Sequence, residues 1–528
     1  MQGEGTNVPF ADTTVTDYLN ELKSNYEKQI HKLKIAVIDY QNKYLEIKER
    51  YDLLIYKRFV RSAEQIPIDE KQGQLFTEDE GKAETGTQEE QEELIEVKSH
   101  SRNKKGRKPL NPDLKRVEKI IDIPEEEKTC ACGAELTRIG EETSERLVII
   151  PQQMYVEKTI RPKYACRHCE GTEDEDTPAV RIAPVEPSMI PKSIATPSLL
   201  SWILIAKFED HLPYYRQEGQ FARIGVQLSR QDMSNWQQQV YQKLHPLFDL
   251  LKDVVKSGPL IQMDETPVQV MGEEGRADTL QSRMWLARGG PAGKKVVWYE
   301  YHDTRGAYHA VEFLTGYVGY LQTDGYEGYD AAVKGNSDII HVGCFAHARR
   351  KFFEASKISE TPRSAEEGIK HIRKLYNVED KLRSENLDNE KFVEQRKTEA
   401  APILAEFKAW LLKRKPEVPP TRLLGIAINY TLDQWDKLVA YLESPYLTPD
   451  NNACERAIRP FVMGRKAWLF CGSPEGAKSS CGIYTLIETA KQNDIVPAHY
   501  LTVLFEKAPL ASSPKDWEKL LPWNIFTP

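Results

Sequence analysis

The sequence is poor in cysteine and contains no long apolar run. Only eight of its 528 residues are cysteines, and four of these form two close pairs. That usage suits metal binding in a reducing compartment better than a disulfide framework. The longest strongly apolar run, residues 199 to 206, is too short to span a bilayer, and the polar first 20 residues lack the basic start and apolar stretch of a secretion signal. We therefore expect a cytoplasmic protein that does not insert into a membrane.

An overall excess of positive charge is also missing. The formal net charge of −8 superficially argues against binding nucleic acid, because neutralising phosphates requires a basic surface. The charge is unevenly distributed, however: residues 65 to 97 hold eleven Asp or Glu and two Lys, so the rest of the chain is close to neutral. A nucleic-acid partner is therefore not excluded. A chain of this length, with 40% hydrophobic residues, predicts a soluble protein of three or more structural units.

Residues 1 to 64 predict a coiled coil. Apolar residues alternate in steps of four and three over four heptads, which is the spacing of a coiled-coil seam. The seam consists of Tyr26, Ile30, Leu33, Val37, Tyr40, Tyr44, Ile47, Tyr51 and Leu54. Self-association into a homo-oligomer is favoured because the stripe is narrow and its flanks are charged. The alternative is a long amphipathic helix docked on its own chain.

Residues 65 to 112 are polar, rich in glutamate and nearly free of aromatic residues, so we expect a disordered linker there. It ends in a short basic arm that contains Lys104, Lys105, Arg107 and Lys108. Such an arm is typical of segments that lie along DNA phosphates or in a minor groove. A solvated charge run without a partner is the alternative.

Residues 113 to 185 carry the two cysteine pairs. One residue separates Cys130 from Cys132, two separate Cys166 from Cys169, and 33 residues of mixed strand character lie between the pairs. Four thiolates suit a tetrahedral zinc ion, although the first pair is one residue shorter than in a standard zinc ribbon. Buried free cysteines are the alternative. The neighbouring histidine at position 168 could replace one of the four ligands.

Residues 186 to 257 predict a helical region with the outline of a helix-turn-helix. Thr196 begins one helix, Gly225 stops a second, and Ser229 begins a third through a capping-box-like pair. Arg230 is then available to a DNA groove. A plain helical subdomain is the alternative.

From residue 258 the pattern changes to short apolar strands, so we expect a multidomain α/β protein. The predicted strands cover residues 260 to 263, 284 to 287, 295 to 301, 317 to 323 and 338 to 342. Residues 361 to 444 are helical in pattern with no strand signal, as in an inserted helical region. The predicted core therefore comprises residues 258 to 360 and residues 445 to 480, the latter as a final helix and hairpin. A C-terminal helical region follows over residues 481 to 528.

Two aspartates lie at predicted strand ends in this core. Asp264 ends the first strand and Asp324 ends the fourth. If these strands are neighbours in a mixed sheet, the two carboxylates emerge side by side, which is the arrangement that holds two magnesium ions around a phosphodiester. Turn formation is the alternative for Asp324, because Asp-Gly is a common turn pair. The same reasoning could select four other nearby acids, Glu265, Asp303, Glu327 and Asp330.

A third acid follows the helical insertion. The Thr-Pro pair at residue 448 predicts the start of a helix, and Pro460 predicts its end. Asn452, Glu455 and Arg459 then share one helix face, so a metal-binding carboxylate points the same way as a phosphate-binding guanidinium. Three acids suffice for a site of two Mg2+ or Mn2+ ions. The predicted phosphate contacts from this segment are Arg456, Arg459, Arg465 and Lys466, the last two in a hairpin.

A second cluster lies just after the predicted strands. His341, Cys344 and His347 could ligate a metal, but three soft ligands without a fourth favour ordinary packing and helix-start roles. Arg349 and Arg350 follow and are expected to contact phosphates.

Taken together, these segments resemble the insertion sequence 66 family of DDE transposases over nearly the whole chain. The resemblance is carried by the two cysteine pairs and by residues 58 to 64, 106 to 110, 215 to 218, 228 to 231, 263 to 266, 323 to 326, 343 to 352, 452 to 459, 464 to 466 and 486 to 491.

The resemblance implies a ribonuclease-H-like core interrupted by a helical insertion, with Asp264, Asp324 and Glu455 on the family's acidic triad. It implies a Mg2+-dependent DNA transposase that binds the ends of its element, cleaves phosphodiesters and transfers strands into target DNA. A zinc-binding segment, accessory proteins of the same element and a bacterial, nucleoid-associated location are also implied. The alternatives are a metal-dependent DNA nuclease without strand transfer and a non-catalytic DNA-binding regulator.

Overall fold

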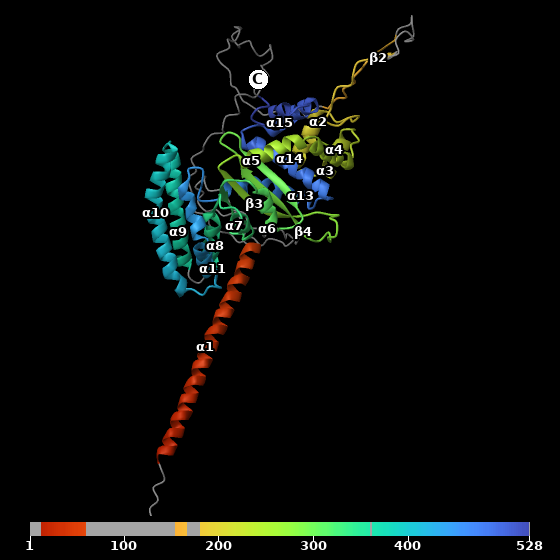
Figure 1. Cartoon of the computed structure of the whole chain (residues 1–528). Coiled ribbons are helices and arrows are strands. Elements are labelled where there is room, and N and C mark those ends of the chain that lie inside the picture. The colour runs from red at the N-terminus through yellow and green to blue at the C-terminus, as the bar shows by residue number, and fades with distance from the viewer. Residues whose placement is uncertain (1–11, 60–153, 166–179, 359–361, 527–528) are drawn as a thin grey trace, which may run out of the picture. The chain divides into compact units, whose positions relative to one another are not determined.

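The computed structural model describes residues 12–59, 154–165, 180–358 and 362–526 (Figure 1). The four cysteines of the predicted zinc site and the basic arm at residues 104 to 108 lie outside these ranges. The chain divides into two units, one of residues 84 to 185 and one of the remainder. In the smaller unit, β1 (Lys163–Ala165) pairs antiparallel with β2 (Val180–Ile182). No helix within the described ranges is long and apolar enough to cross a membrane.

Helix α1 (Asp12–Phe59) is continuous (Figure 1), and its apolar seam is exposed. All nine predicted seam residues are at least half exposed, from Ile30 at 50% to Tyr40 at 72%. The seam therefore does not dock on the part of the chain that the structure describes. A different face does, at Glu49, which is buried and whose Oε2 accepts a hydrogen bond from the backbone N–H of Leu423 at 3.1 Å. Self-association through the seam stays a prediction.

The larger unit is built on a mixed sheet with the strand order β5-β4-β3-β6-β7. Its strands are β3 (Leu260–Gln269), β4 (Gln281–Gly289), β5 (Val296–His302), β6 (Gly319–Gln322) and β7 (Ile339–Val342). β4 is antiparallel to β3 and β5, whereas β6 is parallel to β3 and β7. All five strands predicted from the sequence are present. The predicted neighbours, the first and fourth strands, are confirmed as β3 and β6.

Asp264 does not end its strand, so that prediction is wrong. β3 continues to Gln269 because β4 pairs with it as far as Gln281. The shorter neighbour β6 ends at Gln322, directly opposite Gln262. Within the described residues, β3 therefore has no strand partner on that side from Met263 onward. Asp264 therefore lies just past the end of the neighbouring strand β6, where this side of β3 is open. The predicted strand end would have placed its carboxylate in an equally open position.

The helices that precede and follow the strands in the sequence share the apolar core of the sheet. They are α2 (Pro197–Phe208), α3 (Tyr214–Arg223), α4 (Arg230–Lys243), α5 (His245–Lys256), α13 (Asn452–Trp468), α14 (Pro474–Gln492) and α15 (Pro497–Lys507). The helix starts predicted at Thr196 and Ser229 are confirmed, because these two side chains accept backbone N–H groups at 3.3 and 3.1 Å. Gly225, just after α3, has a φ of +82°, a conformation that glycine adopts without strain.

Helix α14 covers the edge of the sheet that β5 forms. The backbone N–H of Val297 donates to Thr489 Oγ1 at 3.1 Å, and that of Tyr299 donates to Thr485 Oγ1 at 3.0 Å. These threonines satisfy donors that an open edge strand would leave without a partner. α14 also runs across the boundary predicted between residues 480 and 481.

Within the described residues, the chain between β7 and α13 forms helices joined by loops, contains no strand and has a second apolar core. Its helices are α8 (Phe345–Ile358), α9 (Pro362–Ser384), α10 (Asn389–Arg414), α11 (Leu423–Asp433) and α12 (Trp435–Val439). α9 and α10 run side by side (Figure 1), joined by ion pairs such as Lys381 to Glu399 at 2.8 Å. The short helices α6 (Ala307–Phe313), α7 (Gly328–Lys334) and α16 (Pro514–Lys519) lie outside this region.

Helix α13 differs from its prediction at both ends. It begins at Asn452 rather than near Thr448, whose carbonyl instead accepts a hydrogen bond from Gln322. It also continues through Pro460 to Trp468. Proline costs one helical hydrogen bond, but the buried residues on both sides of it hold the helix against the core. Arg465 and Lys466 are therefore in the last turn of a helix, and the predicted hairpin is wrong.

A candidate carboxylate metal site beside the sheet

The structure brings the three predicted acids to one place. Asp264 lies on β3, Asp324 follows the neighbouring β6, and Glu455 lies in the first turn of α13. Burial raises the pKa of Asp264 well above its ordinary value, and the negative charges of Glu265, Asp324 and Glu455 raise it further. Burial also raises the pKa of Glu455, and Asp324 adds to that rise. The three carboxylates are therefore close enough to repel one another.

Few cations within the described residues offset this repulsion. Asp264 Oδ1 accepts a hydrogen bond from the backbone N–H of Glu265 at 2.8 Å, and no described side-chain cation forms an ion pair with it. Glu455 has two partners on α8: its Oε2 lies 3.5 Å from Arg350 Nη2, and its Oε1 lies 3.7 Å from His347 Nδ1. Glu455 Oε1 is buried and accepts no hydrogen bond within the described part of the chain.

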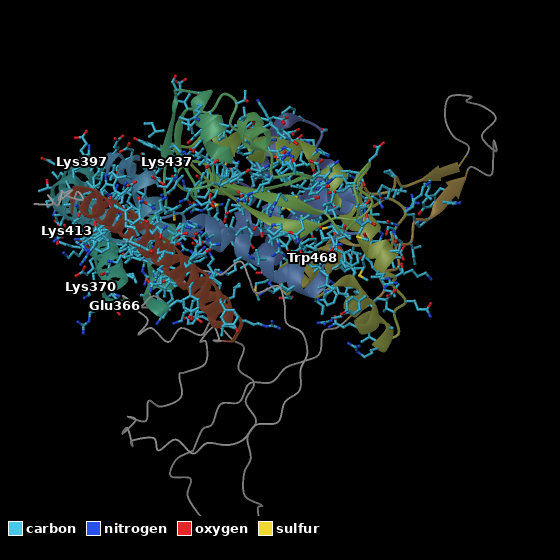
Figure 2. All side chains as sticks on the ribbon, turned by 90° about the horizontal axis from the view of Figure 1, so that it is seen from below. Glu366, Lys370, Lys397, Lys413, Lys437 and Trp468 are labelled. Carbon is cyan, nitrogen blue, oxygen red and sulfur yellow. The ribbon has the colours of Figure 1, made fainter. Side chains whose placement is uncertain are left out.

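The other candidate acids have different surroundings. Glu265 is buried, accepts a hydrogen bond from Arg305 Nε at 2.7 Å and is also bonded to the Tyr329 hydroxyl. Asp330 forms an ion pair with Lys437 at 2.6 Å; Figure 2 labels Lys437, which comes from α12. These two acids are occupied by partners within the fold.

The remaining two candidates are solvated. The Asp303 side chain is half exposed, and its Oδ2 lies 3.9 Å from Arg276 Nη1. Glu327 is exposed at the start of α7. Asp264, Asp324 and Glu455 are thus the acids that converge.

The possible ligand set of His341, Cys344 and His347, against which the sequence favours ordinary packing, is not brought together. His341 lies apart, with Nε2 2.8 Å from Thr323 Oγ1 and Nδ1 3.0 Å from Asp330 Oδ1. Cys344 and His347 instead converge with Glu455, with one ligand atom from each within 4.8 Å of the others. Cys344, just before α8, and His347, on α8, thus border the acidic site. Sequence spacing did not reveal this relationship, because Glu455 comes from a distant helix.

The predicted phosphate contacts fall into different environments. Arg350 and Arg459 both lower the pKa of Glu455, so they lie beside the acidic site. Arg465 is bound to β3, through Thr266 Oγ1 at 3.2 Å and the Pro267 carbonyl, and its guanidinium ties the end of α13 to the sheet. Those at the surface are Arg230, Arg456 and Lys466, whereas Arg349 is partly buried. Figure 2 labels Trp468, which follows Lys466 at the end of α13.

Sequence reasoning missed a wall of the site contributed by α11. A Cβ added at Gly325, next to Asp324, would lie 2.7 Å from the ring of Tyr430. The Lys351 Nζ lies 4.7 Å from the centre of the same ring, and Asp324 raises the pKa of Lys351 against the larger lowering effect of burial. The helical insertion therefore packs directly beside Asp324. The glycine of the Asp-Gly pair was a signal of close approach, but nothing in the sequence identified its neighbour.

The donor set fits a hard divalent cation. Mg2+ prefers one or two carboxylates per ion together with water and substrate oxygens. Three mutually repelling carboxylates, one of them with a buried oxygen that accepts no hydrogen bond within the described residues, are the groups that such a cation stabilises. The metal-binding residues would be Asp264, Asp324 and Glu455.

Comparison with known proteins gives matches along most of the chain. Residues 192 to 479 match the Transposase IS66 family, and residues 127 to 170 match the zinc-finger binding domain of transposase IS66. Residues 485 to 523 match the IS66 C-terminal element, and residues 46 to 118 match a family described as Transposase C of IS166 homeodomain. The second match contains all four cysteines of the predicted zinc site.

Relatives of similar length occur in Sinorhizobium fredii (strain NBRC 101917 / NGR234). The chain is 33% identical over 427 residues to uncharacterized protein y4jD, covering 79% of this chain and 81% of the relative. It is 32% identical over 455 residues to uncharacterized protein y4qI, covering 84% and 82% respectively. The family match over residues 192 to 479 spans more than half of the chain and includes all three acids. The protein therefore belongs to the IS66 family of transposases.

Proposed function

We propose that the protein is a DNA transposase that uses Asp264, Asp324 and Glu455 to cut the ends of its element and join them to target DNA. The observation that carries this proposal is the convergence of three carboxylates beside an opening in the sheet, where Asp324 raises the pKa of both Asp264 and Glu455. Family membership supports the class of reaction.

The topology supports a ribonuclease-H-like core as part of this proposal. The first three strands, β3, β4 and β5, form an antiparallel meander, and β6 and β7 add parallel strands on the other side of β3. Two acids then come from adjacent parallel strands and the third from a helix that follows the insertion. The insertion is accommodated because it has its own apolar core.

The chain's own groups account for the parts of the reaction that require positioning and charge. The three carboxylates would hold Mg2+ or Mn2+, which when bound polarises a phosphodiester and lowers the pKa of the attacking water or hydroxyl. Arg350 and Arg459 place positive charge beside Glu455, where phosphate oxygens would lie. The predicted zinc segment, the basic arm and α3–α4 would bind the element's ends, and α1 would join protomers through its exposed seam.

An Asp324→Asn variant tests this function, because it removes a ligand charge with little change in volume. We expect loss of Mg2+- or Mn2+-dependent cleavage and joining of a DNA duplex carrying the element's ends, with retained binding of that duplex in a mobility-shift assay. Glu327→Gln, which alters an exposed acid three residues away, is the matched control and should cleave normally. Normal joining by Asp324→Asn would refute the assignment.

The products distinguish the two alternative functions. Nicked DNA without joined product would indicate a nuclease with the same acids. Binding of the ends without any cleavage by the wild-type protein would indicate a regulator.

A further inference from the structure

Three buried amides lie close to the three acids in the sequence. Gln262 precedes Asp264 by two residues on β3, Gln322 precedes Asp324 by two residues, and Asn451 immediately precedes the helix that carries Glu455. Their side chains are 2%, 0% and 1% exposed. Burying an amide is unfavourable unless it is hydrogen-bonded, so the partners of these groups indicate what the chain gains from them.

Two of the amides join the acid-bearing strands. Gln262 and Gln322 are directly opposite each other in the parallel register of β3 and β6. The Gln262 Nε2 donates to Gln322 Oε1 at 2.8 Å. The other oxygen of this pair, Gln262 Oε1, accepts a hydrogen bond from Arg288 Nη1 at 3.1 Å. Asp264 is on the same face of β3 as Gln262, because side chains two apart in a strand share a face.

The remaining bonds join both strands to the segment that leads into α13. Gln322 Nε2 donates to the Thr448 carbonyl at 2.7 Å and to the Gly343 carbonyl, just before α8, at 3.3 Å. Asn451 Nδ2 donates to the carbonyl of Met263, the residue before Asp264, at 3.1 Å. The Asn451 backbone N–H donates to Cys344 Sγ at 3.3 Å. The bonds therefore connect every element that contributes an acid.

The orientation of Asn451 argues against a purely local role. It occupies the N-cap position of α13, where asparagine ordinarily accepts a hydrogen bond from the first turn of its own helix. The Asn451 side chain makes no such bond and reaches β3 instead. A capping residue has thus been redirected to fix the helix against the strand that carries Asp264.

We propose that Gln262, Gln322 and Asn451 form an amide clamp that sets the spacing of Asp264, Asp324 and Glu455 for metal binding. This inference rests on the proposed metal-dependent function. Three carboxylates that repel one another tend to separate when no cation is bound, and neutral amides resist that separation without adding charge that would compete with the metal. The three amides act through the acids and are positioning residues.

The rival explanation is that these amides only stabilise the fold, and the chain offers a matched control for it. Gln217 on α3 is also 0% exposed, and its Nε2 also donates to two backbone carbonyls, those of Ile203 at 3.1 Å and Leu212 at 2.9 Å. None of these partners carries or adjoins one of the three acids. Gln217→Met and Gln322→Met therefore each remove two amide-to-carbonyl bonds at equal burial, and Gln322→Met also removes the bond that Gln322 accepts from Gln262.

The test measures Mn2+ binding to the full-length protein by the loss of the electron paramagnetic resonance signal of free Mn2+, alongside thermal unfolding without metal. Removing groups that orient metal ligands typically weakens metal affinity about 10- to 100-fold. We expect that loss in Gln322→Met, Mn2+ affinity like that of the wild type in Gln217→Met, and lower melting temperatures in both. The same loss is expected in Asn451→Ser, which keeps a good N-cap residue and provides a second variant if Gln322→Met does not fold.

The outcomes separate this inference from the proposed function. Wild-type Mn2+ affinity in Gln322→Met or Asn451→Ser would overturn the amide clamp while leaving the function intact, provided that Asp324→Asn has lost binding. Equal weakening in Gln217→Met would also overturn it, because the effect would then follow from stability alone. Failure of the wild-type protein to bind Mn2+ more tightly than Asp324→Asn would refute the proposed function itself, and the clamp with it.

Discussion

Asp264 and Glu265 are consecutive residues on β3, yet their carboxylates have opposite surroundings. Glu265 is held by Arg305 at 2.7 Å and by the Tyr329 hydroxyl, whereas Asp264 accepts a hydrogen bond only from the Glu265 backbone within the described residues. Side chains alternate across a strand, so adjacent acids point to different faces. One acid is stabilised by the fold, and the other is left with repulsion that a cation would relieve.

This difference predicts opposite effects of two isosteric substitutions. Asp264→Asn should abolish metal-dependent cleavage and raise the free energy of unfolding without metal by on the order of 1 kcal/mol, because it removes buried charge repulsion. Glu265→Gln should retain cleavage and lower the free energy of unfolding by about 1 to 3 kcal/mol, because it removes the charge through which the buried Glu265 carboxylate binds Arg305 and the Tyr329 hydroxyl. Urea unfolding and a cleavage assay on both variants check this. Destabilisation by Asp264→Asn would contradict the reading of the site.

The buried His341 predicts a specific acid sensitivity. Its pKa is lowered to about 4, chiefly by burial and also by the charge of Lys437, against the opposing effect of Asp330. An unfolded histidine titrates near pH 6.5, so between about pH 6.5 and 4 the unfolded state binds more protons and stability falls as the pH falls. Between pH 7 and pH 5, protonation linked to His341 alone lowers the free energy of unfolding by about 2 kcal/mol.

The free energy of unfolding of His341→Gln should therefore fall by about 2 kcal/mol less than that of the wild type between pH 7 and pH 5. Urea unfolding at both pH values measures this difference. His31→Gln alters an exposed histidine on α1 and is the control, which should behave like the wild type. An unchanged acid-induced loss in His341→Gln would show that His341 does not stay neutral in the folded state.

The convergence of Cys344, His347 and Glu455 predicts inhibition by a soft metal. Thiolate and imidazole bind Zn2+ more strongly than Mg2+, so Zn2+ at this position would remove Glu455 from the carboxylate site. The Zn2+ concentration for half-inhibition of cleavage should rise at least about tenfold in Cys344→Ser. Cys471→Ser changes another buried cysteine and should leave the Zn2+ concentration for half-inhibition unchanged. Equal inhibition of all three proteins would exclude the site.

Zinc content provides an independent test of the predicted zinc segment. The purified wild-type protein should contain zinc bound by Cys130, Cys132, Cys166 and Cys169, as the family match over residues 127 to 170 suggests. Atomic absorption should detect its loss in Cys169→Ser and its retention in Cys344→Ser. Zinc retained in full by Cys169→Ser would favour the alternative of free cysteines.

The buried Glu49 is one of the contacts that hold α1, together with the pair of Lys57 and Glu354 and the packing of Leu53. Glu49 pairs with Arg422 at 2.6 Å and accepts the Leu423 N–H. Glu49→Ala should accelerate hydrogen exchange at the Leu423 amide about 100-fold, since breaking a buried pair costs about 3 kcal/mol. The control Glu46→Ala removes a surface pair with Arg50, worth less than about 1 kcal/mol, and should have little effect.

The sequence predicted the elements of the core well. Five strands, the helix starts at Thr196 and Ser229 and the helical nature of the insertion follow from local apolar periodicity and capping chemistry, which the folded protein preserves. The errors concern ends of elements. β3 extends past Asp264, and α13 passes through Pro460, because pairing with β4 and burial against the core outweigh the local preference of a single residue.

The sequence by itself supplied Asp264, Asp324 and Glu455 as candidate ligands, through the resemblance of the motifs around them to the insertion sequence 66 family, because a hard metal requires carboxylates and the sequence fixes where these lie along the chain. That Asp264 has no ion-pair partner within the described residues was decided only by tertiary structure. Asp264 and Glu265 are chemically alike and adjacent, and only the packing of Arg305 and Tyr329 distinguishes them. The same holds for Gln322 and Asn451, whose partners come from distant segments. Electrostatic repulsion and hydrogen bonding depend on distances in space, and these are set by the fold as a whole.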